Sequence, residues 1–105
     1  MLVQVSTDSQ IEGNAELEAA TTDRVTRGLD RFGDQITRIE VHLTDENSGA
    51  KGGALDIRCT LEARVSGRQP VVVRHDAANV DQATDGAVRK MRTLLDRDLG
   101  KQGRH

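Results

Sequence analysis

The clearest pattern along the chain is a strict alternation of apolar and polar residues between Ala54 and Val65. A period of two over this length is typical of a β-strand that has one face on a core and one face in water. Because a lone hairpin is marginal in water, this strand needs partners at its edges and a layer over its apolar face. The expected core positions are Leu55, Ile57, Cys59, Leu61, Ala63 and Val65, and the expected solvent positions are Asp56, Arg58, Thr60, Glu62 and Arg64.

Three shorter segments predict the remaining strands. The first is an apolar run that precedes Ser6, and the second is an alternation of apolar with charged residues. The last begins at Pro70, where a missing N–H does the least harm to a sheet. The expected strands are Leu2–Val5, Arg38–Leu43 and Pro70–His75, joined by a polar, glycine-rich connection at Thr44–Gly53 and a tight turn at Ser66–Arg68.

Two segments carry apolar residues at the spacing of an amphipathic helix. Asn14 is the expected N-cap of the first helix, which Gly33-Asp34 should end. The second should begin within Ala77–Gln82, capped by Asn79 or a neighbour, and stop at Gly100 before a frayed basic tail. The expected apolar faces are Leu17, Thr21, Val25, Gly28, Leu29 and Phe32 on the first helix, and Val80, Thr84, Ala87, Val88, Met91, Leu94, Leu95 and Leu99 on the second.

The order of these elements predicts an α+β fold, β-α-β-β-β-α. A right-handed crossover through the first helix makes the first two strands parallel. The two later turns make strands two, three and four an antiparallel meander. The result is a four-stranded mixed sheet with two parallel helices packed on one face, while the other face stays in water or meets a partner.

Composition limits the size and partners of this fold. A chain of 105 residues is expected to form one domain, residues 1–105, with one modest core. Hydrophobic residues make up 35% and charged residues 30%, and the formal net charge is −2. No bulk electrostatic attraction therefore favours nucleic acid, so a polyanion site requires local clustering of the 15 Lys and Arg.

The sequence offers little for catalysis or metal binding. Cys59 lies on the apolar side of its strand and is expected to be an inert core thiol. His42, His75 and His105 are far apart and share no ligand spacing. Because no acid–base or nucleophilic grouping stands out, we expect no enzyme, no metal, no cofactor and no small-molecule substrate.

The chain also lacks signs of a membrane or secreted protein. One cysteine excludes an intrachain disulfide, which fits a reducing cytosol. No run is long and apolar enough to cross a membrane, and Met1–Ser9 lacks the charge and apolar block of a signal peptide. We therefore expect a cytoplasmic protein that does not engage a membrane.

Basic residues gather on one shoulder of each predicted helix. Lys90 and Arg97 share a narrow stripe of the second helix, which Lys101 extends if the helix continues past Gly100. On the first helix, the corresponding shoulder carries Arg24, Arg27 and Arg31, with Asp23 and Asp30 beside Arg27. These residues are either solvated helix flanks, as most Lys and Arg are, or a phosphate-binding surface, which suits the planar guanidinium of arginine.

Nucleic-acid binding by these helices would be constrained in its mode. With one Phe and no Tyr or Trp, the chain has no stacking platform of the RNA-recognition-motif kind. What remains is recognition of structured RNA by shape and backbone charge, with a log–log salt slope of roughly −4 to −5 for about six phosphate contacts. Since the two helices are parallel, one stripe should border the groove between them and the other an outer flank.

The order and spacing of the helix motifs resemble those of the ribosome hibernation-promoting and ribosome-associated inhibitor family, in its short form. The resemblance covers nearly the whole chain, and the order of elements is also that of the family. The second helix carries Ala83-Thr84-Asp85-Gly86-Ala87-Val88-Arg89-Lys90-Met91 followed by Leu95, and the first carries Ile11-Glu12, Asn14, Leu17, Arg24-Val25, Arg27 and Arg31-Phe32.

The resemblance implies a cytoplasmic protein that binds small-subunit rRNA in the channel where tRNAs and mRNA sit. Such a protein blocks translation and promotes ribosome hibernation under stress. Carried over by position, the resemblance implies rRNA-binding roles for Arg24, Arg27, Arg31 and Lys90, and places Arg97 and Lys101 near the start of the family's basic C-terminal segment.

A second hypothesis is a divergent member that kept the fold and acts as a protein-interaction module without ribosome binding. The acids Asp45-Glu46 and Asp81, together with the short basic tail, motivate it. The two hypotheses differ in whether the protein sediments with ribosomes and in whether Lys90 and Arg97 are needed for the physiological partner.

Overall fold

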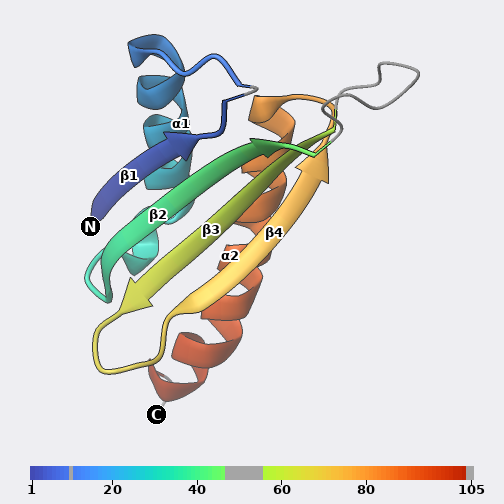
Figure 1. Cartoon of the computed structure of the whole chain (residues 1–105). Coiled ribbons are helices and arrows are strands. Elements are labelled where there is room, and N and C mark those ends of the chain that lie inside the picture. The colour runs from blue at the N-terminus through green and yellow to red at the C-terminus, as the bar shows by residue number, and fades with distance from the viewer. Residues whose placement is uncertain (10, 47–55, 104–105) are drawn as a thin grey trace.

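A computed structural model describes residues 1–9, 11–46 and 56–103, with side chains of the last helix described up to residue 99. Strands and helices follow the predicted order, and the fold class is the predicted α+β (Figure 1). The elements are β1 (Leu2–Thr7), α1 (Ala15–Gly28), the short 3₁₀ helix η1 (Asp30–Phe32), β2 (Ile36–Asp45), β3 (Ile57–Val65), β4 (Val71–Ala77) and α2 (Val80–Gly103).

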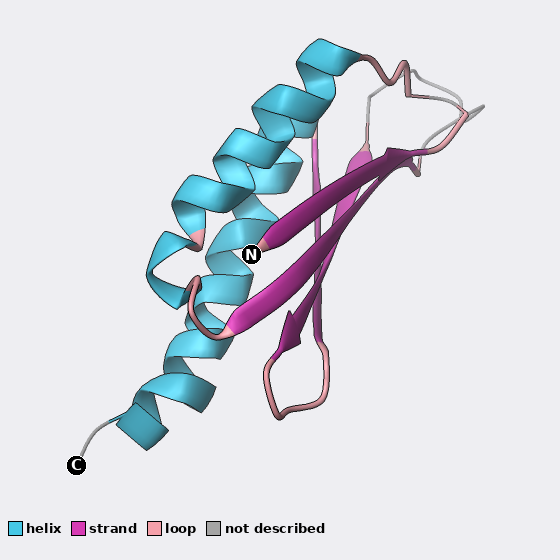
Figure 2. Ribbon diagram, turned by 90° about the vertical axis from the view of Figure 1, so that its left-hand side faces the viewer, coloured by secondary structure: helices cyan, strands magenta, loops and turns pink. Residues whose placement is uncertain are grey.

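The sheet has the predicted mixed topology, in the order β1-β2-β3-β4. β1 runs parallel to β2, and the other two pairings are antiparallel. In register, Val3 pairs with Ile39, and Val41 pairs with Leu61. Both helices lie on the same face of this sheet and run in the same direction (Figure 2).

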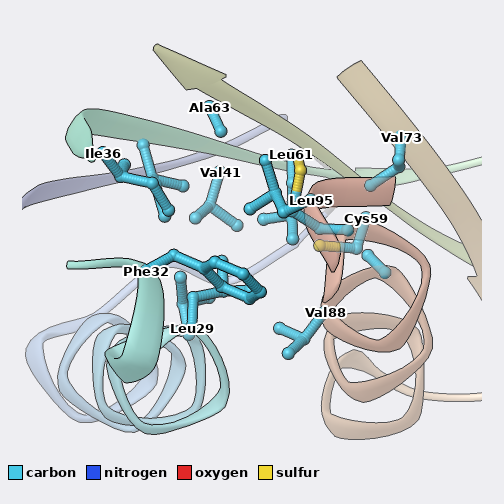
Figure 3. Close-up of a cluster of buried hydrophobic side chains, with 14 of the residues drawn as sticks. Leu29, Phe32, Ile36, Val41, Cys59, Leu61, Ala63, Val73, Val88 and Leu95 are labelled. Atoms are coloured by element: carbon cyan, nitrogen blue, oxygen red, sulfur yellow. The ribbon is translucent and has the colours of Figure 1, made fainter. Parts of the chain in front are cut away.

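The core lies between the helices and the inner face of the sheet. Strand β3 supplies a buried residue at every second position, with Cys59, Leu61 and Ala63 fully buried. Figure 3 shows Leu29 and Phe32 of the helical layer facing the side chains that the strands send inward. The alternation that predicted a half-buried strand is thus confirmed from Ile57 to Val65, whereas Asp56 precedes the strand, and Ala54 and Leu55 lie outside the described residues.

Polar side chains fix the ends of the elements. Asn14 accepts a hydrogen bond from the Leu17 N–H at 2.8 Å, and Asn79 accepts one from the Gln82 N–H at 2.8 Å. Both expected N-caps are therefore confirmed. The Asp8 carboxylate accepts from the Ile11 N–H at 3.1 Å and from the Asp45 N–H at 2.9 Å, which ties the exit of β1 to the end of β2.

The two expected helix ends were wrong. α1 ends at Gly28 rather than at Gly33-Asp34, and its apolar face continues through the separate turn η1 to the buried Phe32. The backbone of α2 stays helical through Gly100 to Gly103. A glycine inside a helix costs only about 1 kcal/mol unless it adopts a left-handed conformation, so it weakens a helix without ending it.

Several other boundaries also differ from the expected ones. β2 begins at Ile36, two residues before the predicted strand, and β4 runs on to Ala77. The predicted turn at Ser66–Arg68 is present, with Gly67 at a φ of +73° that favours glycine. Most of the glycine-rich connection lies outside the described residues, although Thr44 and Asp45 belong to β2.

Glycine brings the second helix close to both of its neighbours. A Cβ at Gly28 would lie 2.3 Å from Val88 Cγ1, so α1 and α2 approach closely at this point. A Cβ at Gly86 would lie 2.0 Å from the His75 ring, so α2 also presses on β4. These two contacts fix the distance of α2 from α1 on one side and from the sheet edge on the other.

Candidate nucleic-acid interface

The predicted basic residues fall into two separate regions. Arg24 and Arg31 reach across to carboxylates of α2, so they border the groove between the helices. Lys90 donates a hydrogen bond to the Arg74 carbonyl oxygen of β4 at 2.7 Å, so it lies on the opposite flank of α2. One stripe thus borders the interhelical groove and the other an outer flank, as the parallel helices predicted.

Arg24 is the most strongly held cation of the groove. Its guanidinium donates to both oxygens of Asp85, at 2.9 and 2.8 Å, and lies 3.1 Å from Asp81 Oδ2. The hydrogen bond to Asp85 is the largest cause that raises the pKa of Arg24 above its usual value. Because both aspartates belong to α2, this cluster also ties the two helices together.

Arg27 and Arg31 are ion-paired as well. Arg27 Nε lies 3.0 Å from Asp23 Oδ1, one turn earlier on α1. Arg31 pairs with Asp96 of α2 and lies over the Phe32 ring, 4.9 Å from its centroid. The two arginines of α1 and Arg31 of η1 are thus matched by carboxylates, which the sequence suggested only for Arg27.

A shallow hollow opens between the helices and is lined mainly by cations. Its lining includes Arg92, an exposed residue of α2 without a carboxylate partner among the residues that the structure describes. Arg92 was not among the residues predicted from the sequence, because only the packing of α2 against α1 reveals which flank of α2 borders the groove. The lining residues are Arg27, Gly28, Asp30, Arg31 and Arg92.

The outer flank of α2 forms a second basic region with the edge of the sheet. Lys90 lies beside Arg58, Arg74, His75 and Asp76 around another shallow hollow. Arg74 has no carboxylate partner within the described part of the chain and was also missed, because its proximity to Lys90 depends on the docking of α2 on β4.

Neighbouring carboxylates hold two of the cations near this flank. Arg58 pairs with Asp76 at 2.8 Å and with Glu46 at 3.4 Å, and the hydrogen bond to Asp76 is the main cause that raises the pKa of Arg58. Arg97 Nε lies 3.5 Å from the adjacent Asp98. Lys101 lies in the helical backbone of α2, but its side chain is outside the described residues.

Within the described part of the chain, Cys59, His42 and His75 do not form a reactive site with one another, and His105 lies outside it. Cys59 is fully buried, and burial raises the pKa of its thiol to about 11, opposed by a weaker interaction with the Thr84 hydroxyl. His42 hydrogen-bonds Ser6 on the outer sheet face at 2.7 Å, whereas His75 lies against Gly86 on the helical side.

No helix of the described chain has both the length and the apolar character needed to span a membrane.

Comparison with known proteins identifies the family of this fold. The model of the sigma 54 modulation protein / S30EA ribosomal protein family matches residues 3–102. The chain belongs to this family. The family assignment suggested by the helix motifs is therefore confirmed, and with it a general association with the ribosome.

Solved structures share the fold of this family member at low sequence identity. A ribosomal subunit interface protein from Coxiella burnetii is 14% identical, with a TM-score of 0.78 over 95% of this chain and 99% of that one. The N-terminal domain of Thermus thermophilus Protein Y is 21% identical, with a TM-score of 0.73 over 92% of this chain and 98% of that domain. Comparison with curated proteins gives no match.

Proposed function

We propose that this protein binds small-subunit rRNA in the tRNA and mRNA channel, inhibits translation and promotes ribosome hibernation under stress. It acts in the cytoplasm, without catalysis, cofactor or membrane. The observation that carries this proposal is the cation-lined groove between α1 and α2 in a member of this ribosome-associated family. Both solved relatives share the fold, and one of them is a ribosomal subunit interface protein.

The rRNA contacts fall on both basic regions, which are the interhelical groove and the outer flank of α2 with the adjoining sheet edge. Guanidinium groups in the groove bind phosphate oxygens in pairs of hydrogen bonds, and the lysines bind them as point charges. Shape and backbone charge carry the recognition, because the chain has no Tyr or Trp to stack on bases. The proposed contacts are Arg24, Arg27, Arg31, Lys90, Arg97 and Lys101, joined by Arg92 in the groove and Arg74 on the flank.

Ion pairs within the free protein do not exclude this role. Arg27 and Arg31 remain exposed and Arg24 is half-buried, and ion pairs at the protein surface are worth little net free energy in water. A phosphate can therefore replace a carboxylate on the same guanidinium at modest cost. Arg92 needs no such exchange, so we assign it the first contact with the phosphate backbone.

Sedimentation of tagged protein with purified small subunits, at low and high salt, tests the proposal. The parent protein should cosediment at low salt, and the charge reversal R27E/R92E should abolish this. The matched control R64E/R68E makes the same change in charge on the outer sheet face and the β3–β4 turn, and should bind like the parent. If a folded parent fails to cosediment even at low salt, the proposal is wrong; equal losses in both variants would exclude the groove as the binding surface.

A second candidate function is that of a protein-interaction module. The double pairing of Arg24 with Asp81 and Asp85 favours it, since these acids neutralise a cation that rRNA binding would use. This candidate predicts that K90E/R97E leaves the physiological partner bound. Loss of that partner in K90E/R97E would contradict it.

A further inference from the structure

The interhelical groove contains three aspartates that hold its arginines. Asp81 and Asp85 of α2 share Arg24, and Asp96 of α2 pairs with Arg31. Arg24 lies on α1 and Arg31 on the following turn η1, and their partners Asp85 and Asp96 lie about three helical turns apart on α2. Paired guanidinium groups thus lie towards the two ends of the groove.

Cations without a carboxylate partner in the described residues lie between these pairs or beside them. Arg92 lines the groove near Arg27 and Arg31, and Arg89 is exposed on α2, four residues after Asp85 and seven before Asp96, so it shares their side of the helix. A polyanion that enters the groove therefore meets unpaired arginines and paired arginines side by side. Full occupation of the groove requires that phosphates displace carboxylates from Arg24 and Arg31.

We infer that Asp81, Asp85 and Asp96 are specificity determinants of the groove, which select a folded RNA surface over generic polyanions. This inference rests on the proposed rRNA binding. A phosphate that displaces Asp85 from Arg24 leaves a free carboxylate next to the phosphate, and this repulsion disfavours binding. A flexible polyanion such as heparin has no fixed set of hydrogen-bond donors opposite the displaced carboxylates.

Folded RNA can satisfy the displaced carboxylates. Its 2′-hydroxyl groups and exocyclic amines donate hydrogen bonds, and unpaired regions present them beside the phosphates. Breaking the ion pairs of Arg24 and Arg31 costs free energy. An RNA surface recovers this free energy if it places phosphates opposite the two arginines and hydrogen-bond donors opposite the aspartates. The aspartates therefore lower the affinity for every polyanion, but they lower it least for a complementary RNA. The groove thus discriminates between RNA surfaces and other polyanions through repulsion by its carboxylates.

The variant D81N/D85N/D96N tests this inference with heparin, a short DNA duplex and purified small subunits as probes. Amides keep the size of the carboxylates and remove the three pairs. If each exposed pair has its usual strength, affinity for heparin and the duplex should rise about tenfold. Affinity for small subunits should rise less, so the ratio of specific to generic binding falls.

The control variant E12Q/E18Q/D34N adds the same charge at exposed acids without a cation partner in the described chain. It should raise the affinity for heparin and the duplex less than the aspartate variant does. The ratio of small-subunit affinity to heparin affinity should stay near the parental value. Equal gains in the two variants overturn the inference and leave the proposed function standing. Failure of the parent to bind small subunits overturns both, while a parallel rise for all probes in the aspartate variant overturns the inference alone.

Discussion

Arg58 shows how charged side chains on the outer sheet face pair with one another. Its guanidinium lies between Asp76 of β4, its cross-strand partner, and Glu46 after β2. Two further pairs lie within single strands, Arg38 with Glu40 in β2 and Arg64 with Glu62 in β3. Cross-strand pairs of opposite charge stabilise a sheet, whereas like charges would repel. The polar alternation in the strands therefore produces a solvated face whose charges largely neutralise one another.

The Arg58–Asp76 pair predicts a specific pH response. The hydrogen bond from Arg58 lowers the pKa of Asp76 below its usual value, so R58Q should raise that pKa towards the ordinary range. Because the folded-state pKa is lowered, the contribution to stability is present above the ordinary carboxyl pKa and is lost as pH falls through the lowered pKa. Carboxyl NMR titration of Asp76 measures the shift, with R64Q as control; an unchanged Asp76 pKa in R58Q would contradict the assignment.

Cys59 gives a second prediction at the scale of the residue. Burial raises its thiol pKa to about 11, so the reactive thiolate is scarce near neutral pH and reagents cannot reach it. A thiol reagent should therefore modify the native protein only through unfolding. Denaturant should increase the rate in step with the unfolded fraction, and fast modification of the native protein would contradict the burial of Cys59.

At the scale of elements, the sequence predicted the strands and caps because their signals are local. Alternation in β3 and the amide side chains of Asn14 and Asn79 each act within a few residues. The partners of Arg24 and Arg31 could not be predicted in the same way, since they lie 57 to 65 residues away on another helix. Arg92 was missed for the same reason: its place in the groove exists only once the helices are packed.

Close packing of α1 on α2 predicts strong coupling between Gly28 and Val88. The Cβ of G28A would lie 2.3 Å from Val88 Cγ1, so the helices must separate, at a cost of about 1–3 kcal/mol. V88A makes room for the new methyl group, so the double variant should be more stable than the sum of the two single effects implies. Thermal or urea unfolding of the four proteins measures this coupling, and additive losses would show that the two residues do not touch.

At the scale of the whole molecule, binding to RNA must arise from the distribution of charge and not from its total. The formal net charge is −2, and many arginines are matched by carboxylates on the same surface. Long-range attraction of the whole protein towards RNA is therefore weak. Affinity instead depends on short-range contacts in the groove and along the outer flank of α2.

This distribution predicts a shallower salt dependence than the basic residues of the sequence suggest. An arginine that exchanges a carboxylate for a phosphate leaves the displaced carboxylate near the RNA, so it adds little net neutralisation of the RNA charge. Counterions are therefore released from the RNA chiefly by its contacts with Arg92, Arg74 and Lys90. With about three or four effective contacts, the log–log slope of affinity against salt should be roughly −2 to −3 rather than −4 to −5. R92Q should reduce this slope by about 0.7, whereas R24Q should reduce affinity with little effect on the slope. Filter binding of small-subunit rRNA over a range of salt concentrations separates the two variants, and an equal change of slope in both would show that the pairing of Arg24 does not persist in solution.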